Sequence, residues 1–499
     1  MRANPPFRCP APERTPGSFF LVPGTADEKG MTCSVVIPCF NGVALTRACI
    51  ESLLQQSEPV QEILVVDNAS TDATAQLADG FGAPVTVLRQ PENLGFAGGV
   101  NAGIAAATGD EVLILNNDTL AAENLVAELR RALRAAPDIG AAAPASNCVK
   151  GEALLPVGHL GKEPASRRQL AAALSEAPVV QDVDTLAGLC LLMRRSTLAE
   201  VGVFDERFGH GNYEDDDLCL RLRLRGYRLV VARRAFLHHE GHATFRSMGL
   251  DLGEELQKRL QQFHAKWHRH PAGLATLASL YGDARLAAAA AEEALRRCPD
   301  WPDATLHLGR YHEREGDAEA AVTHLSAFLS RCPEHVGAML GLGLALLRCG
   351  RPEAGRAQLD RTLARHRLTP AQTVGVFERL GQLALGRGDH PAALQHFSDA
   401  AAENPEHAEA HHGCGLALLA LDRVEAARDA FLRACELGHA LAHTNLGICR
   451  HRLGDDAGAM ASFTRAVELL PDDPVARGNY EAGLAAGMTA SDDPVAARS

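Results

Sequence analysis

The amino-acid sequence has no basic bias and no long apolar run. It carries 49 Lys and Arg residues against 62 Asp and Glu, which gives a formal net charge of −13 at pH 7, and no block rich in Lys or Arg occurs in it. These features argue against a nucleic-acid-binding protein, which needs a basic groove or patch. No apolar run approaches the roughly 18 residues that a membrane-spanning helix requires.

The cysteines lack the spacing of a metal or redox motif. Thirteen are scattered along the chain without a C-x-x-C pair, so a zinc ribbon or thioredoxin-type chemistry has no support. An odd number of scattered thiols suits a reducing compartment. The first residues also lack the long apolar segment of a secretory signal. We therefore expect a cytoplasmic protein, free or held peripherally at the inner membrane face, and the prolines of residues 1–31 predict a disordered leader.

What the sequence does have is a globular composition and two contrasting halves. Hydrophobic residues make up 46% and charged residues 22% of the chain, which is typical of folded proteins. A length of 499 residues exceeds one ordinary domain. The pattern changes near residue 270. We predict an α/β domain over residues 32–270, a repeat domain over residues 271–485 and a flexible tail over residues 486–499.

The second half is rich in Ala and Leu and repeats itself. A Gly-Asp pair or a close equivalent begins at Gly282, Gly316, Gly350, Gly388, Asp422 and Gly454. Another glycine lies seven residues before five of them, at Gly309, Gly343, Gly381, Gly415 and Gly447. Small residues let two helices approach closely, and a glycine between them makes the turn.

This layout, with a period near 34 residues, resembles tetratricopeptide repeats in roughly six units. The resemblance implies an all-α solenoid whose concave surface binds a protein partner or an acceptor. A purely structural or oligomerisation role is the alternative reading of the repeats.

The first half alternates short apolar strands with helices. The strands are predicted at CSVVIPCF, ILVVD, VTVLR and VLIL. Such alternation implies parallel βαβ units, whose strands end at one crevice. Asp67, the Asn93–Gly99 loop and Asp118 would line that crevice. The segment GFAGG does not match G-x-G-x-x-G, so a dinucleotide-binding fold is a poor match.

Five segments then occur in an order that indicates a family. SVVIPCFNG, LVVDNASTD, NLGFAGGVNAGI, LILNNDT and FGHGNYEDDDLCLRLRLRGYRL together resemble inverting GT-A-fold glycosyltransferases of family 2, particularly the rhamnosyltransferase-like branch. The resemblance covers residues 32 to about 250. It implies a Rossmann-like GT-A α/β domain, as in nucleotide-diphospho-sugar transferases, and a nucleoside-diphosphate sugar as donor.

The resemblance implies a nucleotide site at the strand ends. By position in the motifs, nucleotide contacts fall on Pro38, Asp67, Asn93, Gly95 and Asn116. Asn116 departs from the acidic residue often found at its position. Its amide can bond a ribose hydroxyl, but it adds no negative charge.

The resemblance also implies a divalent cation, Mn²⁺ or Mg²⁺. Asp118 is the expected ligand, although LNNDT alone would equally fit a turn or a helix N-cap. In this family a histidine of the later loop completes the metal or diphosphate site. Position favours His238, with His239 as the alternative, and an ordinary loop histidine is the competing interpretation. An imidazole ligand favours manganese over magnesium, which prefers oxygen.

The acidic run Asn212-Tyr213-Glu214-Asp215-Asp216-Asp217 is the second carboxylate group. The family pattern places the catalytic base at Asp215, with Glu214 and Gly188 near the sugar diphosphate. An inverting transfer needs a base because the acceptor hydroxyl loses its proton as it attacks the anomeric carbon. Acidic residues at the start of a helix are also favoured by the helix dipole without catalysis. Asp216 and Asp217 therefore stay open as alternatives.

The secondary structure after the acidic run is ambiguous. Leucines at 218, 220, 222 and 224 alternate with polar residues, which is strand periodicity. The acidic start, the later arginines and Gly226 favour a helix instead. We predict the helix.

Taken together, these motifs predict a metal-dependent inverting glycosyltransferase of hexosyl or rhamnosyl type. It would move a sugar to a hydroxyl of a glycan, a lipid-linked glycan or a protein, and the repeats would bind a partner or the acceptor. One rival is a non-catalytic repeat scaffold with a degenerate nucleotide- or glycan-binding domain. Another is a glycoside hydrolase with two carboxylates, in which the features around Asp67 and Asn93 would have no role.

Overall fold

The structure is a computed structural model that describes residues 31–489, apart from 150, 158–159, 210, 242–251, 300 and 367. The predicted leader up to residue 30 and the tail from residue 490 lie outside the described residues. The described chain divides into two compact units between Ala345 and Leu346. The first unit therefore holds the sheet domain together with the first repeat helices. The domain boundary that we predict near residue 270 is based on the change in sequence pattern, and it stays a prediction.

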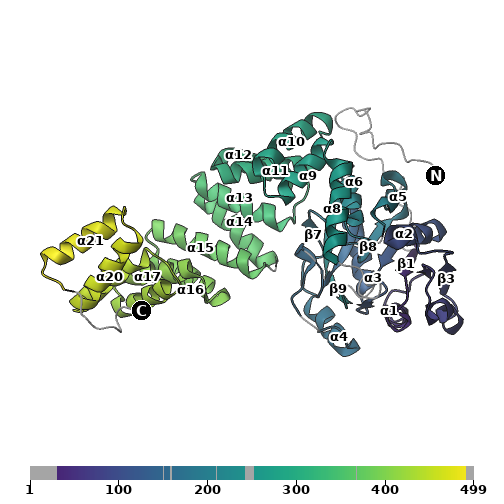
Figure 1. The fold of residues 1–499 in the computed structure, drawn as a ribbon, viewed down its shortest axis with the longest axis horizontal. Helices are drawn as coiled ribbons and strands as arrows, with labels where there is room; N and C mark the ends of the chain where they lie inside the picture. The colour runs from purple at the N-terminus through teal and green to yellow at the C-terminus, as the bar shows by residue number, and fades with distance from the viewer. Residues whose placement is uncertain are drawn as a thin grey trace. The chain divides into compact units, whose positions relative to one another are not determined.

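The first unit is built on a mixed sheet (Figure 1). Its strand order is β3-β2-β1-β4-β8-β6-β9-β5, and β7 pairs with β9 outside that path. Strands β3, β2, β1 and β4 are mutually parallel, as the strand–helix alternation predicts. The strands are β1 Cys33–Cys39, β2 Glu62–Asp67, β3 Val85–Arg89, β4 Glu111–Leu115, β5 Thr119–Ala121, β6 Ile139–Ser146, β7 Gln181–Val183, β8 Cys190–Arg194 and β9 Arg228–His239.

Helices cover both faces of this sheet. Val35 and Ile37 of β1 pack in one hydrophobic cluster, while Val36 between them packs in another. Gly103 lets one helix lie directly on β1, because a Cβ there would come within 2.2 Å of Val36 Cγ1. The helices of this region are α1 Val43–Leu54, η2 Ala73–Gly80, α2 Gly95–Ala106, α3 Leu125–Arg134, η3 Gly151–Ala153, α4 Pro164–Ala173, α5 Arg195–Val201, η4 Glu206–Phe208 and α6 Glu214–Leu224. The predicted helix after the acidic run is thus confirmed as α6.

The rest of the described chain is helical. It comprises α8 Leu252–Trp267, α9 Pro271–Leu280, α10 Ala284–Arg297, α11 Pro302–Glu315, α12 Ala318–Leu329, α13 Val336–Arg348, α14 Pro352–Arg365, α15 Pro370–Gly386, α16 His390–Glu403, α17 Ala408–Ala420, α18 Val424–Glu436, α19 Ala442–Arg452, α20 Asp456–Leu469 and α21 Pro474–Ala485. Within the described residues no helix is both long and apolar enough to cross a bilayer.

The repeat turns form where the sequence predicts them. The first residue of each Gly-Asp pair or equivalent has a positive φ, from 59° at Asp422 to 83° at Gly316. Where an aspartate follows, as at Asp283 and Asp455, its side chain caps the next helix. At Gly381, Gly415 and Gly447 the earlier glycine packs against a phenylalanine ring sixteen residues later, and a Cβ on Gly447 would lie 2.4 Å from Phe463. Small residues at these positions therefore set the close approach of paired helices.

Candidate functional site

The carboxyl ends of the central parallel strands form the edge where the predicted residues gather. β1 pairs with β2 so that Cys39 is opposite Asp67, with Pro38 one position earlier. β4 lies on the other side of β1. β8 runs antiparallel to β4, with Leu115 opposite Cys190. The start of β8 therefore lies at the same edge as the ends of β1, β2 and β4.

Hydrogen bonds join the predicted nucleotide residues of two loops. Asp67 is buried, and its Oδ1 accepts from the Ser70 N–H at 2.9 Å. Asn68 donates from Nδ2 to the Gly95 carbonyl at 3.1 Å. The Asn93 side-chain oxygen accepts from the Gly95 N–H at 2.9 Å. The structure thus brings the end of β2 and the loop before α2 together.

The NASTD segment has a second role that the sequence did not indicate. Asp72 Oδ1 accepts from the Thr74 N–H at 2.9 Å, at the start of η2. Its Oδ2 accepts from the N–H groups of Gly42 at 2.8 Å and Val43 at 3.2 Å, at the start of α1. Burial would raise the pKa of Asp72, but these hydrogen bonds outweigh it and lower that pKa. The available signal was that the residue before α1 is Gly42, which has no side chain to cap the helix.

The side chains of Asn116, Asn117 and Asp118 have different surroundings. Asn116 Oδ1 is buried and has no hydrogen-bond partner among the described residues. Asn117 donates from Nδ2 to Thr46 Oγ1 of α1 at 2.9 Å. Asp118 is buried, and its backbone carbonyl accepts from the Glu240 N–H at 3.1 Å. The unsatisfied Asn116 oxygen is therefore the group of this motif that could accept a ligand hydroxyl.

The structure brings His239, rather than His238, to Asp118. Thr119 of β5 is opposite His239 of β9, and His239 Nε2 lies 3.3 Å from Asp118 Oδ1. Successive side chains of a strand point to opposite faces, so His238 is directed away, with Nε2 3.6 Å from Glu240 Oε1. The sequence favoured His238 as the partner of Asp118, and the geometry favours the alternative, His239.

The two histidines also differ in their titration. Burial lowers the pKa of His238. For His239, burial acts in the same direction, but the Asp118 carboxylate outweighs it and raises the pKa.

The Asp118–His239 pair fits a divalent cation. Ligand atoms in neighbouring positions around an ion, each about 2.1 Å from it, are about 3 Å apart, close to the 3.3 Å between Asp118 Oδ1 and His239 Nε2. His239 Nδ1 lies 2.8 Å from the Cys148 carbonyl, the kind of contact that fixes the ring of a histidine ligand. A carboxylate with an imidazole suits Mn²⁺ better than Mg²⁺.

Asp215 lies in the first turn of α6 and contacts Gly188. Its Oδ2 accepts from the Gly188 N–H at 2.8 Å, and its Oδ1 accepts from the Asp216 N–H at 3.0 Å. A Cβ on Gly188 would lie 3.3 Å from Asp215 Cβ and 3.6 Å from Phe96 Cε1. Gly188 lies two residues before the start of β8. The base candidate thus lies at the same sheet edge as the loop before α2.

The other members of the acidic run have distinct surroundings. Asp217 is fully buried and contacts three donors: Arg221 Nε at 2.9 Å, Trp267 Nε1 at 2.9 Å and Lys266 Nζ at 2.5 Å. With two cations beside it, Asp217 holds α6 against α8 and is unsuited to proton transfer. Asp216 accepts a hydrogen bond from Thr185 at 2.9 Å. The geometry therefore favours Asp215 among the three aspartates.

Glu214 is a buried carboxyl group next to Asp215. Its side chain is buried, and Oε2 has no hydrogen-bond partner among the described residues. Burial first, and the neighbouring charge of Asp215 second, raise the pKa of Glu214 well above its ordinary value. Two adjacent carboxyl groups disfavour the ionisation of both, and the burial of Glu214 makes it the one that holds a proton more readily.

Comparison with known proteins agrees with this geometry. Residues 34–187 match the family model of Glycosyl transferase family 2. Residues 276–335, 316–372 and 378–438 match a tetratricopeptide repeat model.

Three curated relatives are glycosyltransferases. A glycosyltransferase of Streptococcus pneumoniae is 34% identical over 99 residues, which are 19% of this chain and 33% of the relative. The N-acetylglucosaminyl-diphospho-decaprenol L-rhamnosyltransferase of Mycobacterium tuberculosis is 29% identical over 255 residues, covering 44% of this chain and 81% of the relative. The pre-mycofactocin glycosyltransferase of the same organism is 28% identical over 216 residues, covering 43% of each.

The chain thus spans about a third of the pneumococcal relative and less than half of the pre-mycofactocin enzyme, but most of the rhamnosyltransferase. The fold, the ordered motifs and these matches lead to one assignment. Residues 34–187 belong to glycosyl transferase family 2, and the chain joins this glycosyltransferase domain of mixed α/β fold to C-terminal tetratricopeptide repeats.

Proposed function

We propose that the protein is a metal-dependent, inverting glycosyltransferase. It takes a hexosyl or rhamnosyl group from a nucleoside diphosphate and places it on a hydroxyl of a glycan, a lipid-linked glycan or a protein. The observation that carries the proposal is the placement of Asp215 against Gly188, at the sheet edge that also holds Asp67 and Asp118. The mycobacterial rhamnosyltransferase, which is named for N-acetylglucosaminyl-diphospho-decaprenol, supports the lipid-linked class.

Three groups of residues have separate roles in the proposed reaction. Pro38, Asp67, Asn93, Gly95 and Asn116 surround the nucleotide. Asp118 and His239 hold the cation, which offsets the charge of the departing diphosphate when it is bound. Asp215 accepts the proton of the acceptor hydroxyl, and the Gly188 N–H fixes the orientation of its carboxylate.

A base test separates this proposal from a non-catalytic scaffold. Asp215→Asn preserves the size of the side chain and its contact with Gly188 but removes the base, so we expect transfer to fall by at least about 100-fold while donor affinity stays within about twofold. Asp216→Asn is the matched control, with transfer near that of the parent. Turnover of Asp215→Asn comparable to the parent would reject the base assignment.

A binding test addresses the cation and the donor. We expect thermal stabilisation by a nucleoside-diphosphate sugar to increase with Mn²⁺, and this increase to be lost in Asp118→Ala and in His239→Ala but kept in His238→Ala. Loss in His238→Ala alone would restore the assignment that the sequence favoured. Stabilisation by free glycans but by no nucleotide would instead favour a hydrolase or a glycan-binding scaffold.

A further inference from the structure

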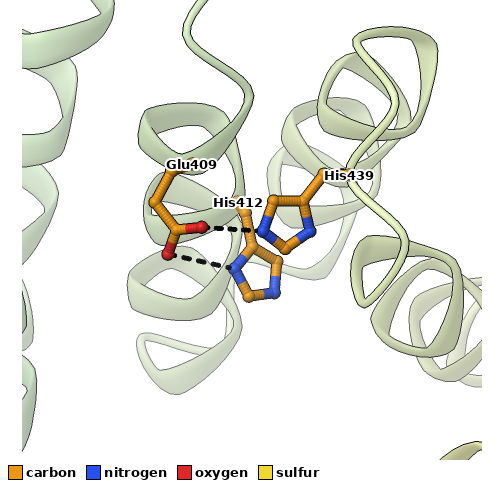
Figure 2. Close-up of side chains that lie close together, drawn as sticks. All are labelled: Glu409, His412 and His439. Atoms are coloured by element: carbon orange, nitrogen blue, oxygen red, sulfur yellow. Dashed lines mark hydrogen bonds and ion pairs between the residues drawn. The ribbon is translucent and has the colours of Figure 1, made fainter.

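A second group of metal-ligating side chains lies in the repeat domain, within the second compact unit. Glu409 and His412 are three residues apart on α17 and share one helix face. His439 comes from the turn between α18 and α19. Figure 2 shows the three side chains converging, and one ligand atom of each lies within 4.8 Å of the others.

The separations within this cluster are close to those of a zinc site. His439 Nε2 lies 2.8 Å from one Glu409 oxygen, and His412 Nδ1 lies 4.0 Å from the other. In a tetrahedral site with bonds of about 2.1 Å, ligand atoms are about 3.4 Å apart. The observed distances fall on either side of that value, so small side-chain rotations would bring the three groups onto one ion.

An independent observation points to a ligand at the same place. His412 is only 7% exposed, and its Nδ1 has no hydrogen-bond partner among the described residues. A buried ring nitrogen left without a partner costs free energy, and a bound ion would satisfy it.

The surroundings of His412 also suit a ligand. Asn445 Nδ2 lies 3.1 Å from His412 Nε2. A 180° rotation of the Asn445 amide group would turn its oxygen to the ring instead. The oxygen would then accept the Nε2 proton and leave the Nδ1 lone pair for a metal, which is the usual second contact of a histidine ligand. The His412 and His439 rings stack with centroids 4.1 Å apart.

We propose that Glu409, His412 and His439 form a binding site for a divalent transition-metal ion, with Zn²⁺ as the best fit. Two imidazoles and one carboxylate are a ligand set that zinc accepts, whereas Mg²⁺ prefers oxygen alone. Because the Glu409 side chain is 42% exposed, a fourth position is open to water. The ion joins α17 to the turn that follows α18, so its binding stabilises the second unit against unfolding.

The test uses the full-length, untagged chain in which Asp118→Asn and His239→Asn remove the ligands of the donor site. Calorimetric titration with Zn²⁺ should show one bound equivalent, and thermal unfolding should move to higher temperature. Adding Glu409→Gln or His439→Asn should weaken Zn²⁺ affinity by about tenfold or more and abolish the thermal shift. His451→Asn is the matched control because His451 pairs with Asp456 at 2.6 Å on the surface, outside this cluster.

Glu409 is partly exposed, so Glu409→Gln tests the site without disturbing the buried His412. Circular dichroism that matches the parent shows that a variant has folded. Unchanged Zn²⁺ affinity in both Glu409→Gln and His439→Asn would overturn the proposal. The absence of any Zn²⁺-dependent shift in the parent background would overturn it too and would leave an ordinary His–Glu ion pair.

Discussion

The ion pair between Arg223 and Asp303 joins the sheet domain to the first repeats, and its removal should be costly. Arg223 of α6 is 1% exposed, and its Nε contacts both Asp303 oxygens at 2.7 and 2.6 Å. Its Nη1 donates to the Val183 carbonyl at 3.2 Å. Asp303→Asn removes the carboxylate that contacts this buried guanidinium. Breaking such a pair costs about 3–5 kcal/mol, so we expect the unfolding free energy of the first unit to fall by that amount.

Tryptophan fluorescence measures this loss selectively. The two tryptophans of the chain, Trp267 and Trp301, are both buried in the first unit, so urea unfolding followed by their emission reports that unit. Arg223→Met combined with Asp303→Leu removes both charges and should recover most of the loss. Arg168→Met, whose partner is Glu123 on the surface, should cost less than about 1 kcal/mol. A loss below about 1 kcal/mol for Asp303→Asn, or no recovery in the double variant, would refute the reasoning.

Three further predictions follow from packing and burial. Gly447→Ala places a Cβ within 2.4 Å of Phe463, so calorimetry should show a loss of about 1–3 kcal/mol, partly recovered by Phe463→Leu; an unchanged transition would contradict the close approach. Burial is the largest cause that lowers the pKa of His307 to about 4 from 6.5. The unfolded chain therefore takes up this proton first, and stability falls by up to about 3 kcal/mol as pH drops from 6.5 to 4. In His307→Phe, urea unfolding at pH 7 and pH 5 should differ less than in the parent, and an equal difference would reject this cause. Gly188→Ala pushes on Asp215, 3.3 Å away, and should lower kcat about tenfold with little change in donor affinity; unchanged kcat would show that the Gly188 contact does not position the base.

Local patterns were enough for much of the fold. The parallel strands, the helix after the acidic run and the repeat turns each depend on residues close together in sequence. Local patterns were not enough to choose between His238 and His239, because a shift of one residue along a strand moves a side chain to the other face. Only the pairing of β5 with β9, which sets Thr119 opposite His239, decides which ring reaches Asp118.

Contacts between distant residues explain what else the sequence left open. Three adjacent aspartates look alike in sequence. Asp217 differs from the other two by its contacts with Lys266 and Trp267, which lie about fifty residues later in the chain. The contact of Asp72 with the start of α1 is also one between distant residues, because Asp72 follows β2 and accepts from the Gly42 N–H after β1. Residue type and spacing predict which side chains gather at a sheet edge. They do not predict which carboxylate is paired there with a cation from a distant part of the chain.

The segment from β7 to Gly188 links the first repeats to the base candidate. Asp182 Oδ2 accepts from the Glu334 N–H at 2.8 Å, and Asp184 pairs with His335 Nε2 at 2.9 Å. The Asp184 side chain is 45% exposed, and the neighbouring Arg310 and His335 hold its pKa well below the ordinary value.

At its other end, the same segment reaches α6. Thr185 donates to Asp216 at 2.9 Å, and Gly188 donates to Asp215 at 2.8 Å. A repeat region that only recruited a partner would need no contact with this segment. Its first helices instead hold one end of a segment, seven residues long from Asp182 to Gly188, whose other end orients Asp215. The first repeats are therefore part of the framework that holds the proposed base in place.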